Sequence, residues 1–340
     1  MFNKFYVSFK NFIKDNLFTF VVLLLFAIFM NYPLDYSIYT SGGTIDVNDR
    51  VVVSGENKSS GSLNLAYVSE LKATPFTYLL SYILPSWDRI SLEEYQASNN
   101  ETMDDIEKRA RAYLELSKQS AIKVAYNYAD KDFNISNTNY EIVYVDNSIK
   151  EDIKIGDILI SVNNTKINDM NTYKNAVANS KIGDYIKLEL KRNNKIIERK
   201  IKVQYINGEK LTGIMVLSLY EYDTSPKIEF KFKNNENGSS GGLMLSLAIY
   251  NKLTEEDITK GLKIVGTGTI DEDGSVGEID GVKYKLMGAV KVNADIFIAP
   301  SGDNYEECKK LIKEKNYNIK LIEAKTFKQV LDELEDINNA

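Results

Sequence analysis

A loop of small residues, Asn-Gly-Ser-Ser-Gly-Gly at positions 237–242, stands directly before an almost wholly apolar stretch from Leu243 to Tyr250. A helix that is apolar on nearly every face is a buried helix, and the unpaired N–H groups at its N-terminus favour a developing negative charge. Glycines in the loop allow backbone and substrate to approach a serine closely. The loop therefore predicts a serine nucleophile beside its own oxyanion donors, although a Gly/Ser turn before a helix is also a common simple cap.

The base that such a serine needs cannot be an imidazole, because the chain contains no histidine. This excludes a Ser-His-Asp triad, a Cys-His pair and every His-ligated metal site. Lysine becomes the leading candidate, provided that burial lowers its pKa. Lys283 and Lys285 border the apolar face of a helix that we expect to begin at about Gly281. The helical wheel does not choose between them, and each is also compatible with a surface lysine whose stem lies on apolar neighbours. Asp280, beside this helix, is expected to be a cap rather than a catalytic acid.

Strands and turns must bring the serine loop and the lysine helix together. An alternating strand is predicted at 227–232, directly before the loop. A second strand is predicted at 264–270, followed by a turn at 273–274 and a short extended piece at 276–279. Beyond the lysine helix, a charged surface helix is expected at 306–315.

The part of the chain from 36 to 121 shows mixed patterns and no internal repeat. We expect strands at 50–53 and 61–68, a helix at 74–83, and a charged amphipathic helix at 104–125 that is capped by Thr102 or Asp104.

The segment from about 122 to 203 has an order of elements of its own. It consists of a strand at 140–145, a turn into a strand at 153–163, a tight turn at Asn163 and Asn164, a short helix at 172–177 and a hairpin around Asn193 and Asn194. This order, with Ile-Gly-Asp-Ile-Leu-Ile-Ser-Val-Asn at 155–163, resembles PDZ domains of the bacterial protease-associated kind. The resemblance implies a module that binds extended peptides by adding a strand to a sheet edge. The pattern does not place the carboxylate-binding loop, and a sandwich that serves only as a spacer is the alternative.

The N-terminus indicates a membrane segment, because lysines precede a run from Leu17 to Met30 in which Thr19 is the only polar residue. The run is shorter than the roughly 20 residues of a standard span, but apolar neighbours extend it. No small-x-small cleavage site follows, so we expect an uncleaved single-pass anchor rather than a signal peptide. The positive-inside rule then predicts a cytoplasmic N-terminus and an extracytoplasmic bulk of the chain. The lysines are Lys4, Lys10 and Lys14, and the extending residues are Phe12, Ile13 and Tyr32.

Composition narrows the remaining function classes. A net charge of −6 and a pI near 5.1, without an aromatic-basic stripe, argue against nucleic acid as a partner. The single cysteine, Cys308, is expected to be a buried structural thiol. Acidic residues at 271–274 suggest calcium but lack the spacing of a 12-residue calcium loop, so a solvated turn is expected. We therefore expect no metal and no cofactor.

Four stretches of the C-terminal part are similar to the proteolytic domain of Lon-type proteases. They are 238–244, 266–270, 274–285 and 294–300, within a match from about Lys227 to Pro300. The similarity is closest to the membrane-anchored, PDZ-containing branch found in Gram-positive bacteria. It implies that Ser240 is the nucleophile, that Lys285 is the base, and that Thr267 helps to hold the amine.

The serine loop departs from the family pattern Asp-Gly-Pro-Ser-Ala-Gly. Asn237, Ser239 and Gly241 replace the aspartate, the proline and the alanine, whereas Gly238 is retained. Ser239 thereby becomes a rival nucleophile, and the extra glycine makes the loop looser.

The sequence as a whole predicts an α+β protein with an N-terminal transmembrane helix, a PDZ-like domain and a Lon-type proteolytic domain. The expected limits are 1–35 for the anchor, 36–121 for an α/β segment that could be the early part of the protease domain, 122–205 for the PDZ-like domain and 206–340 for the proteolytic domain. No Gly-x-x-x-x-Gly-Lys-Ser/Thr phosphate loop occurs, so an ATP-independent serine endopeptidase is expected. Its partners would be protein or peptide substrates and the membrane, and it could form a homo-oligomer. The alternative is an inactive, membrane-tethered PDZ scaffold.

Overall fold

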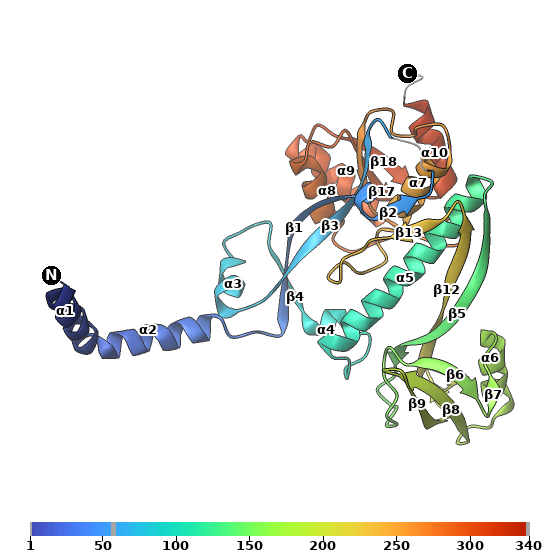
Figure 1. Cartoon of the computed structure of the whole chain (residues 1–340), viewed down its shortest axis with the longest axis horizontal. Helices are drawn as coiled ribbons and strands as arrows, with labels where there is room; N and C mark the ends of the chain where they lie inside the picture. Colours follow the sequence, from blue (N-terminus) through green and yellow to red (C-terminus); the bar gives the residue numbers. More distant parts are fainter. Residues whose placement is uncertain (1, 56–58, 338–340) are drawn as a thin grey trace. The chain divides into compact units, whose positions relative to one another are not determined.

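The computed structural model describes residues 2–55 and 59–337 (Figure 1). The chain folds as two compact units, one formed by Met1–Ser41 with Val68–Tyr95 and the other by Gly42–Tyr67 with Gln96–Ala340. The strands β1 (Tyr36–Asp46) and β3 (Ser62–Lys72) each continue from one unit into the other.

The first unit is built from short helices and one strand pair. Thr74 caps its third helix with a capping box, and β4 pairs antiparallel with β1. Its elements are α1 (Phe2–Asp15), α2 (Leu17–Met30), α3 (Pro75–Leu80), β4 (Asp88–Ser91) and α4 (Leu92–Tyr95).

The predicted apolar run forms α2, but the helix does not continue toward Phe12. The side chain of Asn16 donates to the Phe12 carbonyl at 2.9 Å, and the Asn16 backbone leaves the helical conformation, because a short amide competes for backbone partners. Among the described residues, no single helix is long and apolar enough to cross a membrane. Tyr6–Asp15 and Leu17–Met30 pass the criteria of length and composition only together, and they are bent by 69°.

The second unit contains a largely parallel sheet in the order β18-β17-β14-β3-β1. The pairs β18·β17, β17·β14 and β14·β3 are parallel, and helices connect the successive strands, as parallel pairing requires. The bounds are β14 (Lys263–Gly266), α8 (Val282–Lys291), β17 (Ile296–Pro300), α9 (Asp303–Lys315), β18 (Lys320–Ala324) and α10 (Phe327–Asp336).

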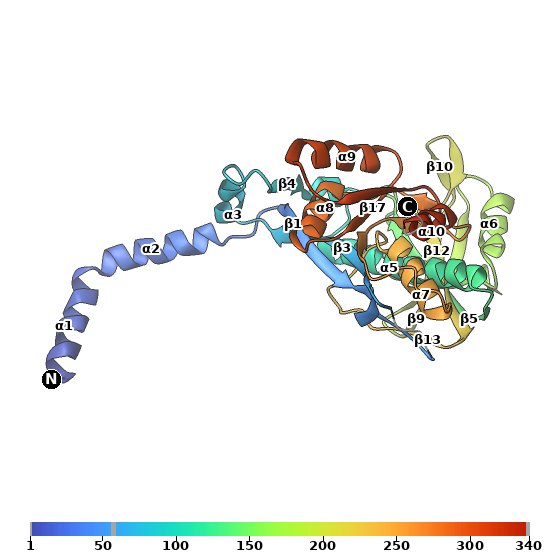
Figure 2. The same cartoon turned by 90° about the horizontal axis from the view of Figure 1, so that it is seen from above.

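Successive residues of these strands face two different layers. Ile264 and Ile296 belong to a core shared with α10 and with the buried helix α7 (Gly242–Leu253), whereas Val265 and Phe297 belong to a core shared with α8 and α9. Figure 2 shows α8 and α9 on one side of these strands and α7 on the other. The second unit is therefore a mixed α/β structure with helices on both faces of its sheet.

The core around α7 also contains residues from much earlier in the chain. Val47, Val51, Val53 and Leu63 are buried with it, and β2 (Val51–Val53) pairs with β13 (Ile228–Phe230), the strand that leads toward the serine loop. The predicted strand at 227–232 is thus present but shorter. The remaining short elements are the 3-10 helix η1 (Val47–Asp49), β15 (Thr269–Ile270) and β16 (Val276–Gly277).

The charged amphipathic helix predicted at 104–125 is α5 (Met103–Tyr128), and Thr102 is its cap, through a capping box with Asp105. One face of α5 packs on α7, and its residues also contact β5 and β12. Gln119, which is buried, accepts from the Tyr220 N–H at 2.8 Å and donates to the Ser218 carbonyl at 3.3 Å, both on β12.

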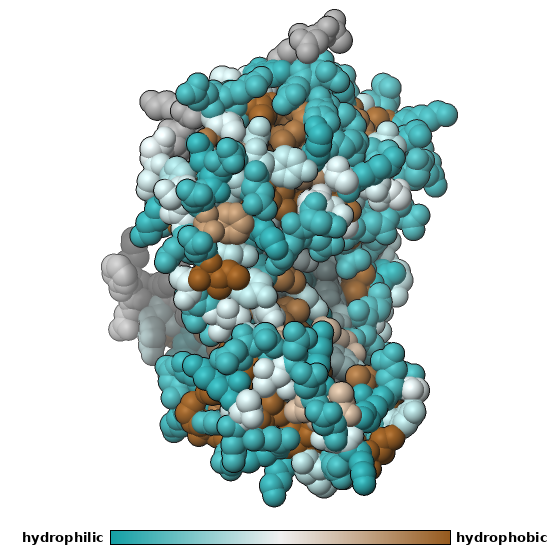
Figure 3. All heavy atoms as spheres, turned by 90° about the vertical axis from the view of Figure 1, so that its right-hand side faces the viewer, coloured by the Kyte–Doolittle hydropathy of each residue, from teal (hydrophilic) through white to brown (hydrophobic). Residues whose placement is uncertain are grey.

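The segment from α5 to β12 forms a second sheet in the order β12-β5-β6-β8-β9 over a core of its own. The turns predicted at residues 163–164 and 193–194 are confirmed, since all four asparagines there have positive φ. Hydrophobic residues are interspersed among hydrophilic ones on the face drawn in Figure 3. The bounds are β5 (Asp132–Val145), β6 (Ile158–Val162), β7 (Thr165–Lys166), α6 (Met170–Asn179), β8 (Tyr185–Arg192), β9 (Lys195–Lys202), β10 (Gln204–Ile206), β11 (Glu209–Leu211) and β12 (Ile214–Ser225).

Candidate active site

The serine loop at 237–242 leads into α7. At two of its positions a residue larger than glycine would be strained, at one because of packing and at the other because of the backbone conformation. A Cβ at Gly242 would lie 2.7 Å from the side chain of Ile270 and 3.0 Å from the Ser117 hydroxyl, so only glycine packs there. Gly238 has φ +92°, a conformation that side chains disfavour. Ser240 is half-buried at the end of this loop, directly before the Gly241 cap of α7.

Thr267 joins the predicted lysine to the predicted serine. The Lys285 Nζ donates to the Thr267 Oγ1 at 3.1 Å, and the Thr267 hydroxyl donates to the carbonyl of Ser240 at 3.0 Å. The Gly268 N–H donates to the same carbonyl at 2.8 Å. Residues from the loop, from the strand region and from α8 therefore meet at one point.

The expectation of one strand at 264–270 was wrong at its centre. β14 ends at Gly266 and β15 begins at Thr269, because Gly268 has φ +148° and turns the backbone. The two residues in the break are the ones whose groups bind the Ser240 carbonyl. An apolar, β-branched pattern conceals such a break, since the pattern itself continues through it.

The structure separates the two lysines that the helical wheel left open. Lys285 is 4% exposed, and burial lowers its pKa to about 8, although the charge of Asp280 opposes that change. Lys283 is only half-buried, with its Nζ 4.9 Å from the centre of the Tyr284 ring. Only Lys285 combines burial with a hydrogen bond toward residue 240.

Asp280 was expected to cap the lysine helix, and this was wrong. Gly281 is the N-cap of α8, in the left-handed conformation at φ 68°, and as a glycine it has no side chain that could cap the helix. Asp280 precedes the cap and is exposed, so it acts on Lys285 as a charge at a distance.

Two contacts of the serine loop come from α5 and were not foreseen from the sequence. The Gly238 N–H donates to the Ala110 carbonyl at 3.0 Å, and the hydroxyl of Ser117, which is buried, donates to the Ser239 carbonyl at 3.3 Å. Ala110 and Ser117 are seven residues apart, so they lie on one face of the helix. The sequence signal that could have predicted these contacts is the pair of small residues, Ala110 and Ser117, at this spacing on the buried face of the helix.

At the start of α7, some backbone N–H groups donate a hydrogen bond within the protein and others do not. The Gly242 N–H donates to the Ser239 carbonyl at 3.2 Å, and the Leu243 N–H donates to the Gly268 carbonyl at 3.1 Å. The N–H groups of Ser240 and Gly241 have no acceptor among the residues that the structure describes. These two groups, one on Ser240 and one on the next residue, can donate to an oxyanion that forms at the Ser240 side chain.

The remaining candidates for chemistry are structural. Asp273 accepts from the Ser275 N–H at 2.9 Å, and Glu272 forms an ion pair with Lys123. These two carboxylates of the acidic turn therefore have partners within the protein. Cys308 is fully buried, and burial raises the pKa of its thiol to about 12. Within residues 2–55 and 59–337, no group of three or more His, Cys, Asp or Glu side chains could hold a metal ion.

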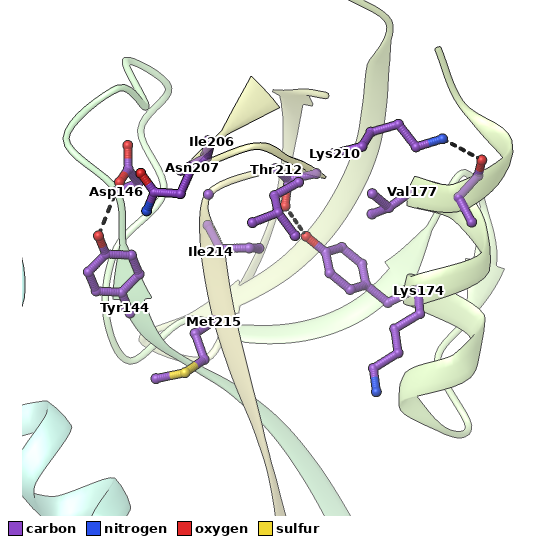
Figure 4. A pocket seen from close by; sticks show the side chains of 14 residues that line it. Tyr144, Asp146, Lys174, Val177, Ile206, Asn207, Lys210, Thr212, Ile214 and Met215 are labelled. Carbon is purple, nitrogen blue, oxygen red and sulfur yellow. Dashed lines mark hydrogen bonds between the residues drawn. The ribbon is translucent and has the colours of Figure 1, made fainter. Parts of the chain in front are cut away.

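A pocket of about 610 Å³ lies between α6 and the start of β12 (Figure 4). The Tyr173 hydroxyl is hydrogen-bonded to Thr212, and the Lys210 Nζ donates to the carbonyl of Ala178 at 2.6 Å and to that of Ser180 at 3.0 Å. Within the described sheet β12 pairs only with β5, so it is an edge strand. The apolar side chains that line the pocket include Val177, Ile206, Leu211, Ile214 and Met215.

Comparison with known protein families agrees with both parts of this structure. The model of the Lon protease (S16) C-terminal proteolytic domain matches residues 234–335, and the model of the PDZ domain matches residues 117–203. The chain carries a PDZ domain and a Lon-type proteolytic domain. The Lon-type match contains the serine loop, Thr267 and Lys285, and it indicates a serine protease.

The comparison with curated proteins found no match. Among solved structures, the PDZ domain of the SdrC-like protein from Listeria monocytogenes is similar at 17% sequence identity and a TM-score of 0.22. The alignment covers 25% of this chain and 93% of that one.

The PDZ match begins inside α5 and ends before the loop that leads to β12. The PDZ domain of this structure nevertheless includes β12, which is its edge strand and lines the pocket. The residues at 211–215 line the pocket together with Tyr173, Lys174 and Val177 of α6.

Proposed function

We propose that the protein is a membrane-anchored, ATP-independent serine endopeptidase in which Ser240 is the nucleophile and Lys285 is the general base. The observation that carries the proposal is the buried amine of Lys285, linked to residue 240 through Thr267. Burial favours the neutral form of the amine, which can accept a proton. The Lon-type match supports the same assignment.

In the proposed reaction, the neutral Lys285 takes the proton of the Ser240 hydroxyl as the oxygen attacks the carbonyl carbon of a peptide bond. The N–H groups of Ser240 and Gly241 stabilise the oxyanion of the tetrahedral intermediate. The lysine ammonium then gives its proton to the leaving amine, which leaves an ester on Ser240. Water attacks this ester while Lys285 accepts its proton. The lysine ammonium returns that proton to the Ser240 oxygen as the ester bond breaks, and the carboxylic acid product is released.

Substrate delivery is assigned to the PDZ groove between α6 and β12. An extended peptide can pair with the edge of β12 while an apolar side chain enters the pocket of Val177, Ile214 and Met215. The sequence has no phosphate loop, so substrates would have to arrive extended or flexible. Gln119 joins α5 to β12, and Ser117 joins α5 to the serine loop, so one helix contacts both the strand at the groove and the loop that carries Ser240.

The anchor is assigned to α2 together with α1, with the N-terminus in the cytoplasm and the bulk of the chain outside. The lysines before the apolar run and the exposed apolar side chains of α2 support this orientation. We also assign the segment containing β2 and β3 to the proteolytic domain, since its side chains share the core with α7.

A fluorophosphonate that labels serine nucleophiles tests the central assignment. Labelling and hydrolysis of an unfolded protein substrate are expected for the wild type and for Ser239→Ala, and both should be lost in Ser240→Ala and Lys285→Met. Labelling that persists in Ser240→Ala and vanishes in Ser239→Ala would transfer the role to the neighbouring serine. An unlabelled wild type that still binds peptides would identify the scaffold alternative.

A further inference from the structure

An apolar surface on the first unit is uncovered in the segment formed by α3 and the turn after it, residues 75–84. Phe76, Leu79, Tyr82 and Ile83 are 56%, 58%, 65% and 74% exposed. Backbone hydrogen bonds continue the helical turn to the end of the segment, so Phe76, Leu79 and Ile83 lie on one face. These four residues are called the α3 patch below.

The α3 patch is fixed beside the end of α2. The Leu34 N–H donates to the Ala73 carbonyl at 2.9 Å, and the Ala73 N–H donates to the Tyr36 carbonyl at 3.0 Å, so the chain leaving α2 is bonded to the chain entering α3. The two helices are in contact within the same unit. The side chains of α2 are themselves exposed, with Leu24 at 61%, and the two apolar surfaces therefore adjoin.

The border of the patch is aromatic and basic. The Arg89 guanidinium carbon lies 3.9 Å from the centre of the Tyr82 ring and 5.6 Å from that of Tyr78, and Lys72 is exposed nearby in sequence. The only tryptophan of the chain, Trp87, follows in the next turn. Amphipathic rings and cations beside an apolar face are characteristic of segments that lie at the membrane–water interface.

We infer that the α3 patch inserts into the interfacial layer of the same lipid bilayer that α2 enters, so that the first unit rests on the membrane surface. The inference rests on the proposed anchoring by α2, whose apolar surface the patch continues. Lipid is the occupant favoured over a second copy of the chain, because Arg89 and Lys72 complement lipid phosphate groups and because a bilayer covers both apolar surfaces at once.

The test places a polarity-sensitive fluorophore on the patch in the full-length chain. Leu79→Cys is labelled with a nitrobenzoxadiazole maleimide, and Cys308, at 0% exposure, is inaccessible to the reagent in the folded protein. The protein is reconstituted in vesicles of phosphatidylethanolamine and phosphatidylglycerol containing a spin-labelled phospholipid. The expected result is blue-shifted emission that the spin label quenches and aqueous iodide does not. Ile196→Cys, 54% exposed on β9, is the matched control and should be quenched by iodide alone.

Quenching of residue 79 by iodide would overturn the inference, and so would protection from both quenchers, which would indicate cover by a second copy. Alkaline carbonate extraction separates these failures from failure of the proposed anchoring, since an unanchored protein leaves the vesicles whereas an anchored one stays. The variant Phe76→Asp with Ile83→Asp should remain in the vesicles but move the probe on residue 79 into water. An unchanged probe in that variant would also contradict the inference.

Discussion

The amine of Lys285 lies 3.1 Å from the hydroxyl of Thr267, and both side chains are buried, at 4% and 0% exposure. Because the threonine hydroxyl gives its own proton to the carbonyl of Ser240, it can only accept from the amine. The N–H of the lysine is thereby directed to Thr267, which leaves the lone pair of a neutral amine free to take a proton from elsewhere. This hydrogen bond orients the proposed base and leaves its lone pair available.

Replacing Thr267 by valine should lower kcat by about 10-fold or more, because the change keeps the shape and removes a hydrogen bond worth about 1–3 kcal/mol when its partner stays buried. Steady-state hydrolysis of a fluorogenic peptide measures the effect. Thr259→Val is the matched control, since Thr259 is also fully buried but binds Asp257 instead. A comparable loss of kcat in the control would show that destabilisation alone explains the result.

The rate should rise with pH and level off above about 8, because only the neutral form of Lys285 can accept a proton and burial lowers its pKa to about 8. The profile of kcat/KM against pH reports this group in the free enzyme. Asp280→Asn should move the midpoint to lower pH, because the carboxylate of Asp280 raises the lysine pKa. A midpoint that moves upward in this variant would contradict the assignment.

Lys285→Met should abolish activity and make the folded protein more stable at pH 7. In the folded protein the pKa of Lys285 is about 8, whereas an exposed lysine has an ordinary pKa of 10.5, so the unfolded chain binds the proton more tightly. The free energy of unfolding of the wild type therefore rises with pH between about 8 and 10.5, by about 3 kcal/mol over this range. Denaturant unfolding of both proteins at several pH values measures it. The advantage of the variant should shrink as pH rises, and a gap that is independent of pH would show that burial is not its cause.

Ser117→Ala should lower kcat by a few-fold and leave KM unchanged, because the Ser117 hydroxyl positions the loop through the Ser239 carbonyl and does not touch substrate. Its net hydrogen bond is worth about 1 kcal/mol, which corresponds to roughly a 5-fold change. Ser120→Ala is the control, since Ser120 is equally buried at 3% on the same helix and has no hydrogen bond to the loop in the described structure. Equal kinetics of the two variants would remove Ser117 from the positioning role.

Much of the local structure could be predicted because it depends on neighbours in the chain. The wholly apolar stretch after the serine loop predicts the buried helix α7, and the asparagine pairs at 163–164 and 193–194 predict the turns of the PDZ domain. Side-chain chemistry alone limits the possible N-cap of α5 to Thr102 or Asp104. In each case the residues that determine the local structure lie within the short stretch that adopts it.

By itself, then, the sequence determined that the chain has no histidine and that a serine loop precedes a buried helix, and it made a lysine near residue 285 the candidate base. The helical pattern could not choose between Lys283 and Lys285, and the resemblance to Lon-type proteases favoured Lys285. The tertiary structure buries Lys285 and leaves Lys283 half-buried, because both lie at the edge of one helix face and the packing around that face covers only one of them. It also decided the break at Thr267 and Gly268, the contacts of α5 with the loop, and the groove that β12 forms with α6. These features join segments far apart in the chain, and their energies arise from burial and from long-range hydrogen bonds that no local pattern contains.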